Sequence, residues 1–249
     1  MTLKVKIKEK SYLNKHDNSR INVLKNVNFN LKSNEFVCIV GPSGCGKTTL
    51  MNMIGGIISL DQNQVEIINQ QQKEENFGYV FQTSRLLPWL TVMENIELVC
   101  EHKKIDKKKI FNLLESFGLK DFINFYPKSI SGGMRRKVAL ARALVNDPSI
   151  LLMDEPFVSL DQPTSENLYK VLINYKKKNP ITVIFITHVL KEALLLGDRI
   201  LFFSKKPGTI VFDYKVNSKK KPLTLDNIYI DKEYKVLKTK HPQLLQGLI

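Results

Sequence analysis

The chain has 249 residues, enough for one large or two modest domains with a sizeable buried core. Apolar residues make up 43% of it and charged residues 25%, the ordinary composition of a soluble globular protein. No apolar run approaches the roughly 18 residues of a membrane-spanning helix, and residues 1–6 lack the apolar block of a signal peptide. We therefore expect the protein to remain in the compartment where it is made.

The cysteines and the net charge bear on the setting in which the protein works. Cys38, Cys45 and Cys100 form no Cys-x-x-Cys pair, which argues against a disulfide framework and a zinc site and fits a reducing cytoplasm. The net charge of +14 is compatible with nucleic acid, anionic lipid or a polyphosphate as a partner. The lysine runs lie apart and contain few aromatic residues, which favours a solvated surface with modest attraction to acidic lipid headgroups.

The first predicted elements are strands of two kinds. Residues 3–7 and 23–31 alternate apolar with polar side chains, which indicates half-buried antiparallel strands. Residues 35–40 form a continuous apolar run of strand length that ends in a glycine-rich loop. Such a run is typical of a strand covered on both faces, as in a parallel sheet.

A helical segment follows between residues 83 and 145. Its clearest helices are predicted at 93–101 and 106–117, where apolar residues recur at helical spacing. We interpret the segment as a mainly helical insertion within an α/β domain.

The last predicted elements return to buried strands. Continuous apolar runs lie at 150–153, 181–186 and 199–203. A helix is predicted at 163–178, and strands that alternate with helices indicate a three-layer α/β domain. From residue 214 the chain is rich in lysine, and we expect a partly ordered appendix.

The glycine-rich loop matches the phosphate-binding pattern G-x-x-x-x-G-K-[ST] at every fixed position. It reads Gly41-Pro42-Ser43-Gly44-Cys45-Gly46-Lys47-Thr48. A buried strand precedes it and an amphipathic helix follows, so backbone N–H groups and the helix N-terminus can face phosphates. Lys47 supplies a positive charge to the β- and γ-phosphates, and the Thr48 hydroxyl can bind Mg²⁺.

Two acids follow the buried run at 150–153. Asp154 comes at the end of this strand, where a carboxylate beside a phosphate loop can hold Mg²⁺ through water. Glu155 is next and can orient and deprotonate an attacking water. With the phosphate loop, the two acids predict a site that hydrolyses a nucleotide.

A serine-glycine segment lies shortly before these acids, and the combination resembles the ABC ATPase family. The segment reads Ser131-Gly132-Gly133-Met134-Arg135. A serine and two glycines at the start of a helix, predicted at 135–145, present N–H groups and a hydroxyl to an anion. In the family this anion is the γ-phosphate held by the other subunit. The resemblance therefore implies a head-to-tail dimer of two copies that encloses two ATP molecules.

Further landmarks of the family occur in the expected order, and the resemblance implies their roles. Gln82 would reach Mg²⁺ and the attacking water. Asp161, in Ser159-Leu160-Asp161, would lie in a loop that crosses the dimer interface. His188 would contact the γ-phosphate as a switch.

The resemblance also implies contacts to the rest of the nucleotide. Thr49 would join the phosphate loop in binding it. Tyr12 matches the aromatic residue that stacks on adenine, and His16 is the alternative, because the stretch from 12 to 23 is longer than usual in the family.

Three features narrow the resemblance to the nitrate/sulfonate/taurine importer branch. They are Met134-Arg135 in place of the Gln version, Leu86-Leu87-Pro88-Trp89, and Lys206-Pro207-Gly208-Thr209-Ile210. Ile130 in place of Leu, and Lys137 where Gln or Arg is more usual, depart from the family pattern but remove no phosphate contact.

The resemblance covers residues 3–213 and implies an α/β fold: a P-loop NTPase (RecA-like) core with an N-terminal antiparallel β subdomain and an inserted α-helical subdomain. The core would comprise 3–82 and 146–213, the insertion 83–145, and the Lys-rich appendix 214–249.

The implied function is an ATPase subunit that uses ATP and Mg²⁺ to drive solute import at the cytoplasmic face of the cell membrane. Its partners would be a second copy of itself, an integral membrane permease and, indirectly, an extracellular or periplasmic solute-binding protein, with no nucleic acid. The alternatives are an exporter subunit and a soluble ABC ATPase that acts on nucleic acid or in cofactor assembly.

Overall fold

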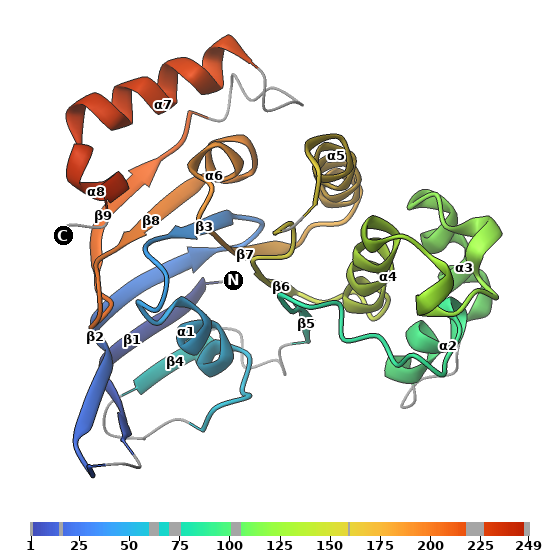
Figure 1. Ribbon diagram of the computed structural model, residues 1–249, viewed down its shortest axis with the longest axis horizontal. Helices are drawn as coiled ribbons and strands as arrows, with labels where there is room; N and C mark the ends of the chain where they lie inside the picture. Colours follow the sequence, from blue (N-terminus) through green and yellow to red (C-terminus); the bar gives the residue numbers. More distant parts are fainter. Residues whose placement is uncertain are drawn as a thin grey trace. The chain divides into compact units, whose positions relative to one another are not determined.

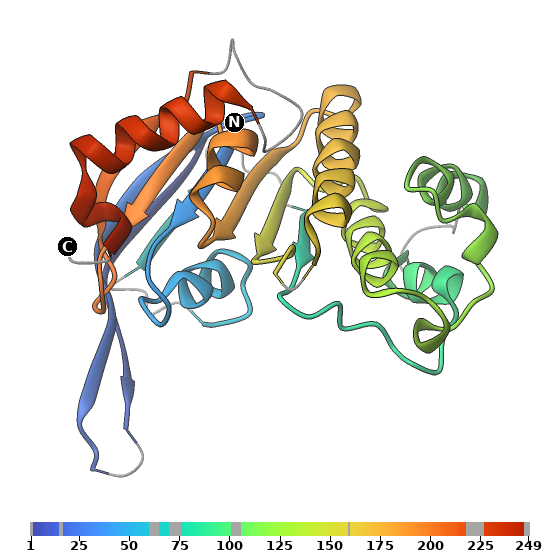
Figure 2. The same cartoon turned by 45° about the horizontal axis from the view of Figure 1, so that its top comes forward.

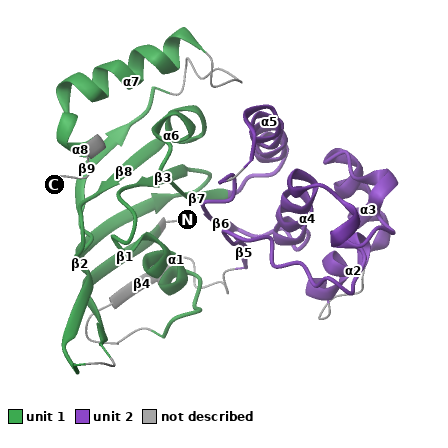
Figure 3. Ribbon diagram, viewed as in Figure 1, with its two compact units in different colours: residues 1–74, 182–249 green, residues 75–181 purple. Residues whose placement is uncertain are grey.

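The structure is a computed structural model that describes residues 2–14, 17–59, 65–69, 76–100, 106–158, 160–217 and 227–246. The chain folds as two compact units: residues 1–74 with 182–249 form unit 1, and residues 75–181 form unit 2 (Figure 3). Within the described ranges, no helix has both the length and the apolar character needed to cross a bilayer.

Unit 1 contains two sheets and the helices that flank them (Figure 1). Its elements, in chain order, are β1 (Thr2–Leu13), β2 (Arg20–Lys32), β3 (Phe36–Val40), α1 (Lys47–Ile54), β4 (Val65–Asn69), β7 (Thr182–Thr187), α6 (Leu190–Leu196), β8 (Arg199–Phe203), β9 (Ile210–Lys215), α7 (Ile228–Lys240) and α8 (Pro242–Gln246).

The first sheet of unit 1 is antiparallel and has the order β2-β1-β4. β1 and β2 form a long hairpin (Figure 2), in which Val5 lies opposite Phe29 and Ile7 opposite Val27. All four side chains are buried, because alternate residues of each strand point to the same face. The predicted antiparallel strands are confirmed, and both extend further than the apolar alternation indicates.

The second sheet places β3 between β7 and β8, both parallel to it, with β9 antiparallel beside β8. Every residue of β3 and β7 is buried, as their continuous apolar sequences predict. Val40 at the end of β3 lies opposite Thr187 at the end of β7. The chain segments that follow these two strands therefore start from the same edge of the sheet.

The carboxyl-terminal segment contains two helices, α7 and α8, that its lysine-rich composition does not predict. Tyr214 lies in β9, and α7 packs against α6. Ile230 and Leu237 are buried, and Lys191 of α6 forms an ion pair of 2.8 Å with Asp231 of α7. Two core residues seven positions apart among exposed lysines are too sparse a pattern to predict this helix from the sequence.

Unit 2 is mainly helical. Its elements are β5 (Phe77–Val80), α2 (Val92–Glu97), the 3₁₀ turns η1 (Leu98–Cys100), η2 (Lys120–Phe122) and η3 (Pro127–Ser129), and α3 (Lys107–Ser116), α4 (Gly132–Leu144), β6 (Ile150–Asp154) and α5 (Gln162–Lys178). β5 and β6 pair in parallel, and α4 contacts α2, α3, α5 and β5. Val138, Ala141 and Leu144 are buried along one face of α4, at the spacing of a helix that packs on a core.

Candidate nucleotide site

The phosphate loop (residues 41–48) connects β3 to α1 in unit 1. Gly44 has φ 76° and Gly46 has φ 103°, a left-handed backbone that glycine adopts without steric cost. Gly46 is the N-cap of α1, so the loop leads directly into a helix N-terminus. Ser43, Gly44 and Thr48 are exposed. The loop thus has the local form of an anion-binding turn.

Lys47 runs back along this loop. Its ammonium group donates hydrogen bonds of 2.8 Å to the carbonyl oxygens of both Gly41 and Pro42, and the residue is only 6% exposed. The thiol of Cys45 lies 3.9 Å from the ammonium nitrogen, and burial raises the pKa of Cys45. The loop therefore holds one fixed positive charge at its centre, suited to a polyphosphate.

His188 follows β7 at the edge of the sheet where the phosphate loop begins. The buried Thr187 hydroxyl donates to the carboxylate of Glu192 in α6 and accepts the N–H of Val189 at 3.0 Å. These bonds hold the backbone on both sides of His188, whose side chain is exposed. These contacts therefore fix the backbone turn that carries His188.

Tyr12 lies near the end of β1, opposite Ile21 of β2. Its ring is 41% exposed, and the ammonium group of Lys10 lies 5.8 Å from the ring centroid. An exposed ring on a hairpin is a suitable surface for stacking on a base. His16, the alternative, lies outside the described residues.

Asp154 and Glu155 lie at the end of β6 in unit 2. Asp154 is only 5% exposed. On the adjacent strand β5, the burial of Tyr79 and the negative charge of Asp154 raise the pKa of Tyr79. Glu155 has φ 45°, a left-handed conformation that costs a non-glycine residue free energy. The backbone therefore turns sharply at Glu155, directly after the buried carboxylate.

The signature segment (residues 131–133) starts α4. Ser131 is the N-cap, and its hydroxyl oxygen accepts the N–H of Met134 at 3.2 Å. Arg135 donates to the carbonyl oxygens of Pro127 and Ile130 at 3.2 and 2.6 Å, which holds the preceding turn. Ser131 and Gly132 are exposed, so this helix N-terminus is open to an anion.

Gly133, in the signature segment, packs against the start of α5. A Cβ at Gly133 would lie 2.4 Å from Cγ2 of Thr164, so only glycine fits at this distance. Thr164 is held by Asp161, whose two carboxylate oxygens accept its N–H at 2.8 Å and its hydroxyl at 2.9 Å. These bonds lower the pKa of Asp161. Unit 2 thus brings together the predicted signature and the predicted interface aspartate, while Ser159 lies outside the described residues.

Gln82 follows β5 and is exposed. Arg136 of α4 donates to the carbonyl oxygen of Phe81 at 3.2 Å. Arg142 of the same helix donates to the carbonyl oxygens of residues 84 and 85 at 3.0 and 2.9 Å. The helix that begins with the signature segment therefore holds the backbone on both sides of Gln82.

Several supporting residues are absent from the sequence prediction. Thr164 had a partial signal, because an aspartate such as Asp161 is a typical N-cap whose carboxylate accepts an N–H two or three residues later. Arg142, Thr187 and Glu192 carried none, because their partners are brought to them only by tertiary packing.

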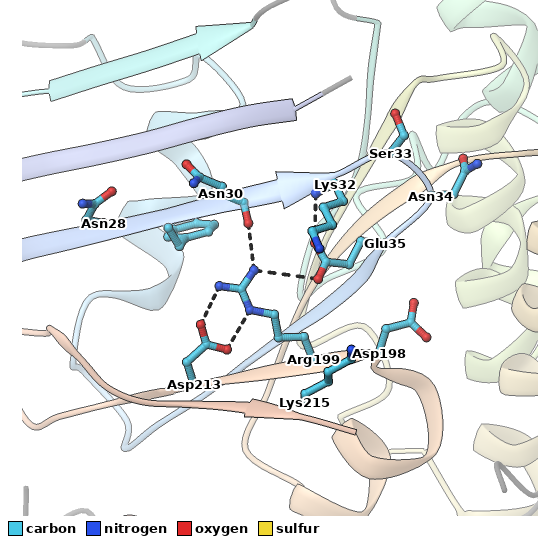
Figure 4. A pocket seen from close by; sticks show the side chains of 11 residues that line it. Asn28, Asn30, Lys32, Ser33, Asn34, Glu35, Asp198, Arg199, Asp213 and Lys215 are labelled. Carbon is cyan, nitrogen blue, oxygen red and sulfur yellow. Dashed lines mark hydrogen bonds and ion pairs between the residues drawn. The ribbon is translucent and has the colours of Figure 1, made fainter. Parts of the chain in front are cut away.

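A cavity of about 820 Å³ lies elsewhere in unit 1 (Figure 4). Arg199 crosses it and binds Asp213 at 2.7 Å, the carbonyl oxygen of Asn30 at 2.8 Å and Glu35 at 3.7 Å. None of the predicted site residues lines it. Arg199 pairs there with Glu35 and Asp213, so the cavity contains an ion-pair cluster that links β8 to β9 and to the start of β3.

Comparison with known proteins agrees with these features. The ABC transporter family matches residues 24–158. The chain is 43% identical to the aliphatic sulfonates import ATP-binding protein SsuB of Bacillus thuringiensis subsp. konkukian (strain 97-27), over 83% of each chain. It is 40% identical to the taurine import ATP-binding protein TauB of Pelagibacter ubique (strain HTCC1062), over 79% of this chain and 76% of the relative.

A solved structure gives the same answer for the fold. The ATP-binding cassette MJ0796, a dimer in a post-hydrolysis state bound to ADP and Pi, matches with a TM-score of 0.75 and 32% identity. The match covers 87% of this chain and 99% of that one. The predicted P-loop NTPase core, with an antiparallel β subdomain and inserted helices, is confirmed. The chain belongs to the ABC transporter family, as one of its ATP-binding and ATP-hydrolysing subunits.

Proposed function

We propose that this protein powers the import of a small sulfonate-, taurine- or nitrate-like solute through a separate membrane permease, as a peripheral subunit at the cytoplasmic face of the membrane. The importing relatives support the direction and the class of solute. The branch-like segments at 86–89 and 206–210 support the same assignment.

One observation carries the proposal: the chain has two separate helix N-termini built for phosphate. The first follows the phosphate loop and starts α1 in unit 1, and the second follows Ser131 and starts α4 in unit 2. Each has exposed hydroxyl-bearing and glycine residues: Ser43, Gly44 and Thr48 at the first, Ser131 and Gly132 at the second. We infer that residues 41–48 of one copy and 131–133 of a second copy enclose each ATP, with Asp161 at the interface between them.

The nucleotide contacts follow from the chemistry of the residues. Lys47 neutralises the β- and γ-phosphates, Thr49 continues the phosphate contacts and Tyr12 stacks on adenine. Thr48, Asp154 and Gln82 carry the hard oxygen donors that Mg²⁺ prefers and would hold it, and the buried Asp154 would provide the negative charge. Mg²⁺, when bound, neutralises charge on the phosphates and orients them.

Hydrolysis needs a base and a group that binds the γ-phosphate. Glu155 accepts the proton of the attacking water, because its carboxylate comes directly after the metal-binding carboxylate. His188 contacts the γ-phosphate from the turn that Thr187 holds. Loss of the γ-phosphate removes the bridge between the two copies, and the dimer opens.

The segment after Gln82 is suited to contact a permease. Trp89 is 68% exposed, although tryptophan is highly buried on average. Asn95 is fully buried and binds the backbone of the segment, accepting the N–H of Leu87 at 2.8 Å and donating to the carbonyl oxygens of Leu87 and Leu90 at 3.1 and 3.0 Å. A rigid, exposed apolar segment next to Gln82 can pass movement at the ATP to a membrane partner.

Glu155→Gln tests the dimer and the base together. With ATP and Mg²⁺ we expect this variant to retain ATP, lose turnover by at least about 100-fold and elute as a dimer in size-exclusion chromatography with light scattering. Lys47→Ala in the same background is the control and should remain monomeric. A strictly monomeric, ATP-loaded Glu155→Gln protein, or wild-type turnover by it, would overturn the proposed mechanism.

Reconstitution with the permease tests the direction and the solute. The complex is placed in liposomes with its ATPase subunits outside and with the solute-binding protein and labelled taurine, an alkanesulfonate or nitrate inside. ATP added outside should move one of these solutes out of the lumen, toward the ATPase side. With the labelled solute placed outside instead, ATP-driven accumulation in the lumen would identify an exporter.

A further inference from the structure

The loop between β8 and β9 (residues 204–209) contains a segment for which the proposed function has no role. Ser204 is only 8% exposed, and its hydroxyl faces two acceptors, the carbonyl oxygens of Lys205 at 2.8 Å and Pro207 at 3.1 Å. The hydroxyl oxygen of Ser204 accepts the N–H of Thr209 at 3.0 Å. The loop is therefore fixed from within and presents Gly208 in one position.

Gly208 is bound to β2 by its backbone. Its N–H donates to the carbonyl oxygen of Val23 at 2.8 Å, and its carbonyl oxygen accepts the N–H of Lys25 at 3.0 Å. On its other side it contacts the phosphate loop: a Cβ at Gly208 would lie 2.1 Å from the carbonyl oxygen of Cys45. Any side chain would have to displace this backbone oxygen, because no flexible atom stands between them.

Gly46, which follows Cys45 in the phosphate loop, lies directly against β2. A Cβ at Gly46 would lie 2.9 Å from the carbonyl oxygen of Val23 and 2.8 Å from Cδ2 of Leu24. The peptide between Cys45 and Gly46 is thus enclosed by β2 on one side and Gly208 on the other. In a trans peptide the C=O and N–H groups point in opposite directions. A Cys45 carbonyl directed at Gly208 therefore directs the Gly46 N–H away from it.

We propose that Gly208 is a positioning residue for phosphate binding, which sets the orientation of the Cys45–Gly46 peptide and hence of one N–H donor to the phosphates. The inference rests on the proposed assignment of residues 41–48 as the ATP site. It gives the Lys206-Pro207-Gly208 segment a physical role: this loop and β2 together support the phosphate loop from the side that phosphate does not reach.

Gly208→Ala is the direct test, with ATP affinity measured by titration calorimetry. The carbonyl oxygen of Cys45 must move by about 1 Å, and a misplacement of this size costs a positioned group up to about 100-fold. We expect a Kd for ATP raised between roughly tenfold and 100-fold and a KM raised in parallel, with kcat at saturating ATP changed much less. A merely structural glycine would lower the melting temperature without this separation of KM from kcat.

Gly197→Ala is the matched control in the same unit. A Cβ there would lie 2.7 Å from both the carbonyl oxygen of Ala193 and the Sγ of Cys38, so it is crowded without contacting the phosphate loop. It should lower stability and leave the Kd for ATP within about twofold of wild type. Equal weakening by both substitutions, or wild-type affinity in folded Gly208→Ala, would overturn the proposal.

Ser204→Ala is a second test of the positioning role of Gly208 if Gly208→Ala does not fold. It removes the contacts of the Ser204 hydroxyl with the carbonyl oxygens of Lys205 and Pro207 and with the N–H of Thr209 and adds no atoms, so the loop loosens around Gly208. We expect a smaller rise in the Kd for ATP, and an unchanged Kd would count against the inference. Wild-type protein that binds no ATP at all would instead contradict the proposed function.

Discussion

Arg142 of α4 donates a hydrogen bond of 3.0 Å to the carbonyl oxygen of Ser84, two residues after Gln82. Its second terminal nitrogen binds the next carbonyl oxygen at 2.9 Å, so one planar guanidinium spans two consecutive peptides. Because α4 begins with the signature segment, this contact joins the Gln82 segment to the part of the chain that is proposed to meet the second ATP.

Replacing Arg142 should therefore affect both stability and turnover. Arg142→Ala removes two charged hydrogen bonds, and we expect a loss of about 1.5–3 kcal/mol in the free energy of unfolding, measured with urea. We also expect kcat to fall between roughly tenfold and 100-fold as Gln82 loses its position.

Lys137→Ala on the same helix is the control, because among the described residues Lys137 makes no hydrogen bond to the Gln82 segment. Arg142→Lys should be intermediate, since an ammonium group cannot match two carbonyl oxygens in one plane. An unstable Arg142→Ala protein with wild-type kcat would show that the contact only supports the fold.

The features of this molecule that could be predicted from the sequence are those that a local sequence pattern determines. The phosphate loop is recognisable because the left-handed turn at Gly46 requires glycine at a fixed position, directly before the lysine that starts the helix. β3 and β7 are recognisable because strands buried on both faces leave no place for polar residues. The fold class follows from these elements and their order.

Contacts between distant segments were not predictable in the same way. The need for glycine at position 208 is set by a carbonyl oxygen of the phosphate loop, and the need for glycine at 133 by a methyl group on α5. The carbonyl oxygens bound by Arg142 lie in another element. α7, which contains the buried Ile230, packs against α6. Each of these relationships appears only when the chain is folded.

The contact between Gly133 and Thr164 predicts a compensating pair of substitutions. Gly133→Ala places a Cβ 2.4 Å from Cγ2 of Thr164 and should cost about 1–3 kcal/mol of stability through overpacking. Thr164→Ser removes that methyl group and keeps the hydroxyl that binds Asp161. In the Thr164→Ser background, Gly133→Ala should be neutral or stabilise by up to about 1 kcal/mol, because alanine favours helix.

Urea unfolding of the four proteins measures this coupling. Gly132→Ala is the control for added helix propensity, because the nearest atom to its Cβ, on the flexible Arg135 side chain, is 3.8 Å away. If the effects of Gly133→Ala and Thr164→Ser simply add, the methyl contact is not what requires glycine at this position.

Asp161 predicts a specific dependence of stability on pH. Hydrogen bonds from the backbone and hydroxyl of Thr164 lower its pKa in the folded state. The unfolded chain therefore takes up the proton first as the solution becomes acidic. The stabilisation is complete above the unfolded pKa of about 3.9 and is lost as pH falls through the folded pKa. Asp161→Asn retains a good helix cap but does not titrate.

We expect the free energy of unfolding of Asp161→Asn to fall less steeply than that of the wild type between about pH 5 and pH 3. Urea titrations at several pH values in this window measure the two slopes. Identical slopes would mean that the bonds from Thr164 do not favour the ionised form.

The turn around His188 links a buried hydroxyl to turnover. Thr187→Val keeps the shape of a buried side chain but removes the hydroxyl that binds Glu192 and the N–H of Val189. We expect a loss of about 1–3 kcal/mol in the free energy of unfolding and a lower kcat, because His188 is no longer held toward the γ-phosphate. Thr187→Ser keeps the hydroxyl and should restore most of both.

Thr182→Val is the matched control on the same strand. Thr182 is also buried, and its hydroxyl oxygen accepts the N–H of Asn34 at 3.1 Å, at the end of β7 remote from His188. It should lower stability to a similar degree and leave kcat unchanged, since the turn at His188 keeps both of its bonds. A Thr187→Val protein that loses stability but hydrolyses ATP at the wild-type rate would mean that the hydroxyl supports the fold and does not position the histidine.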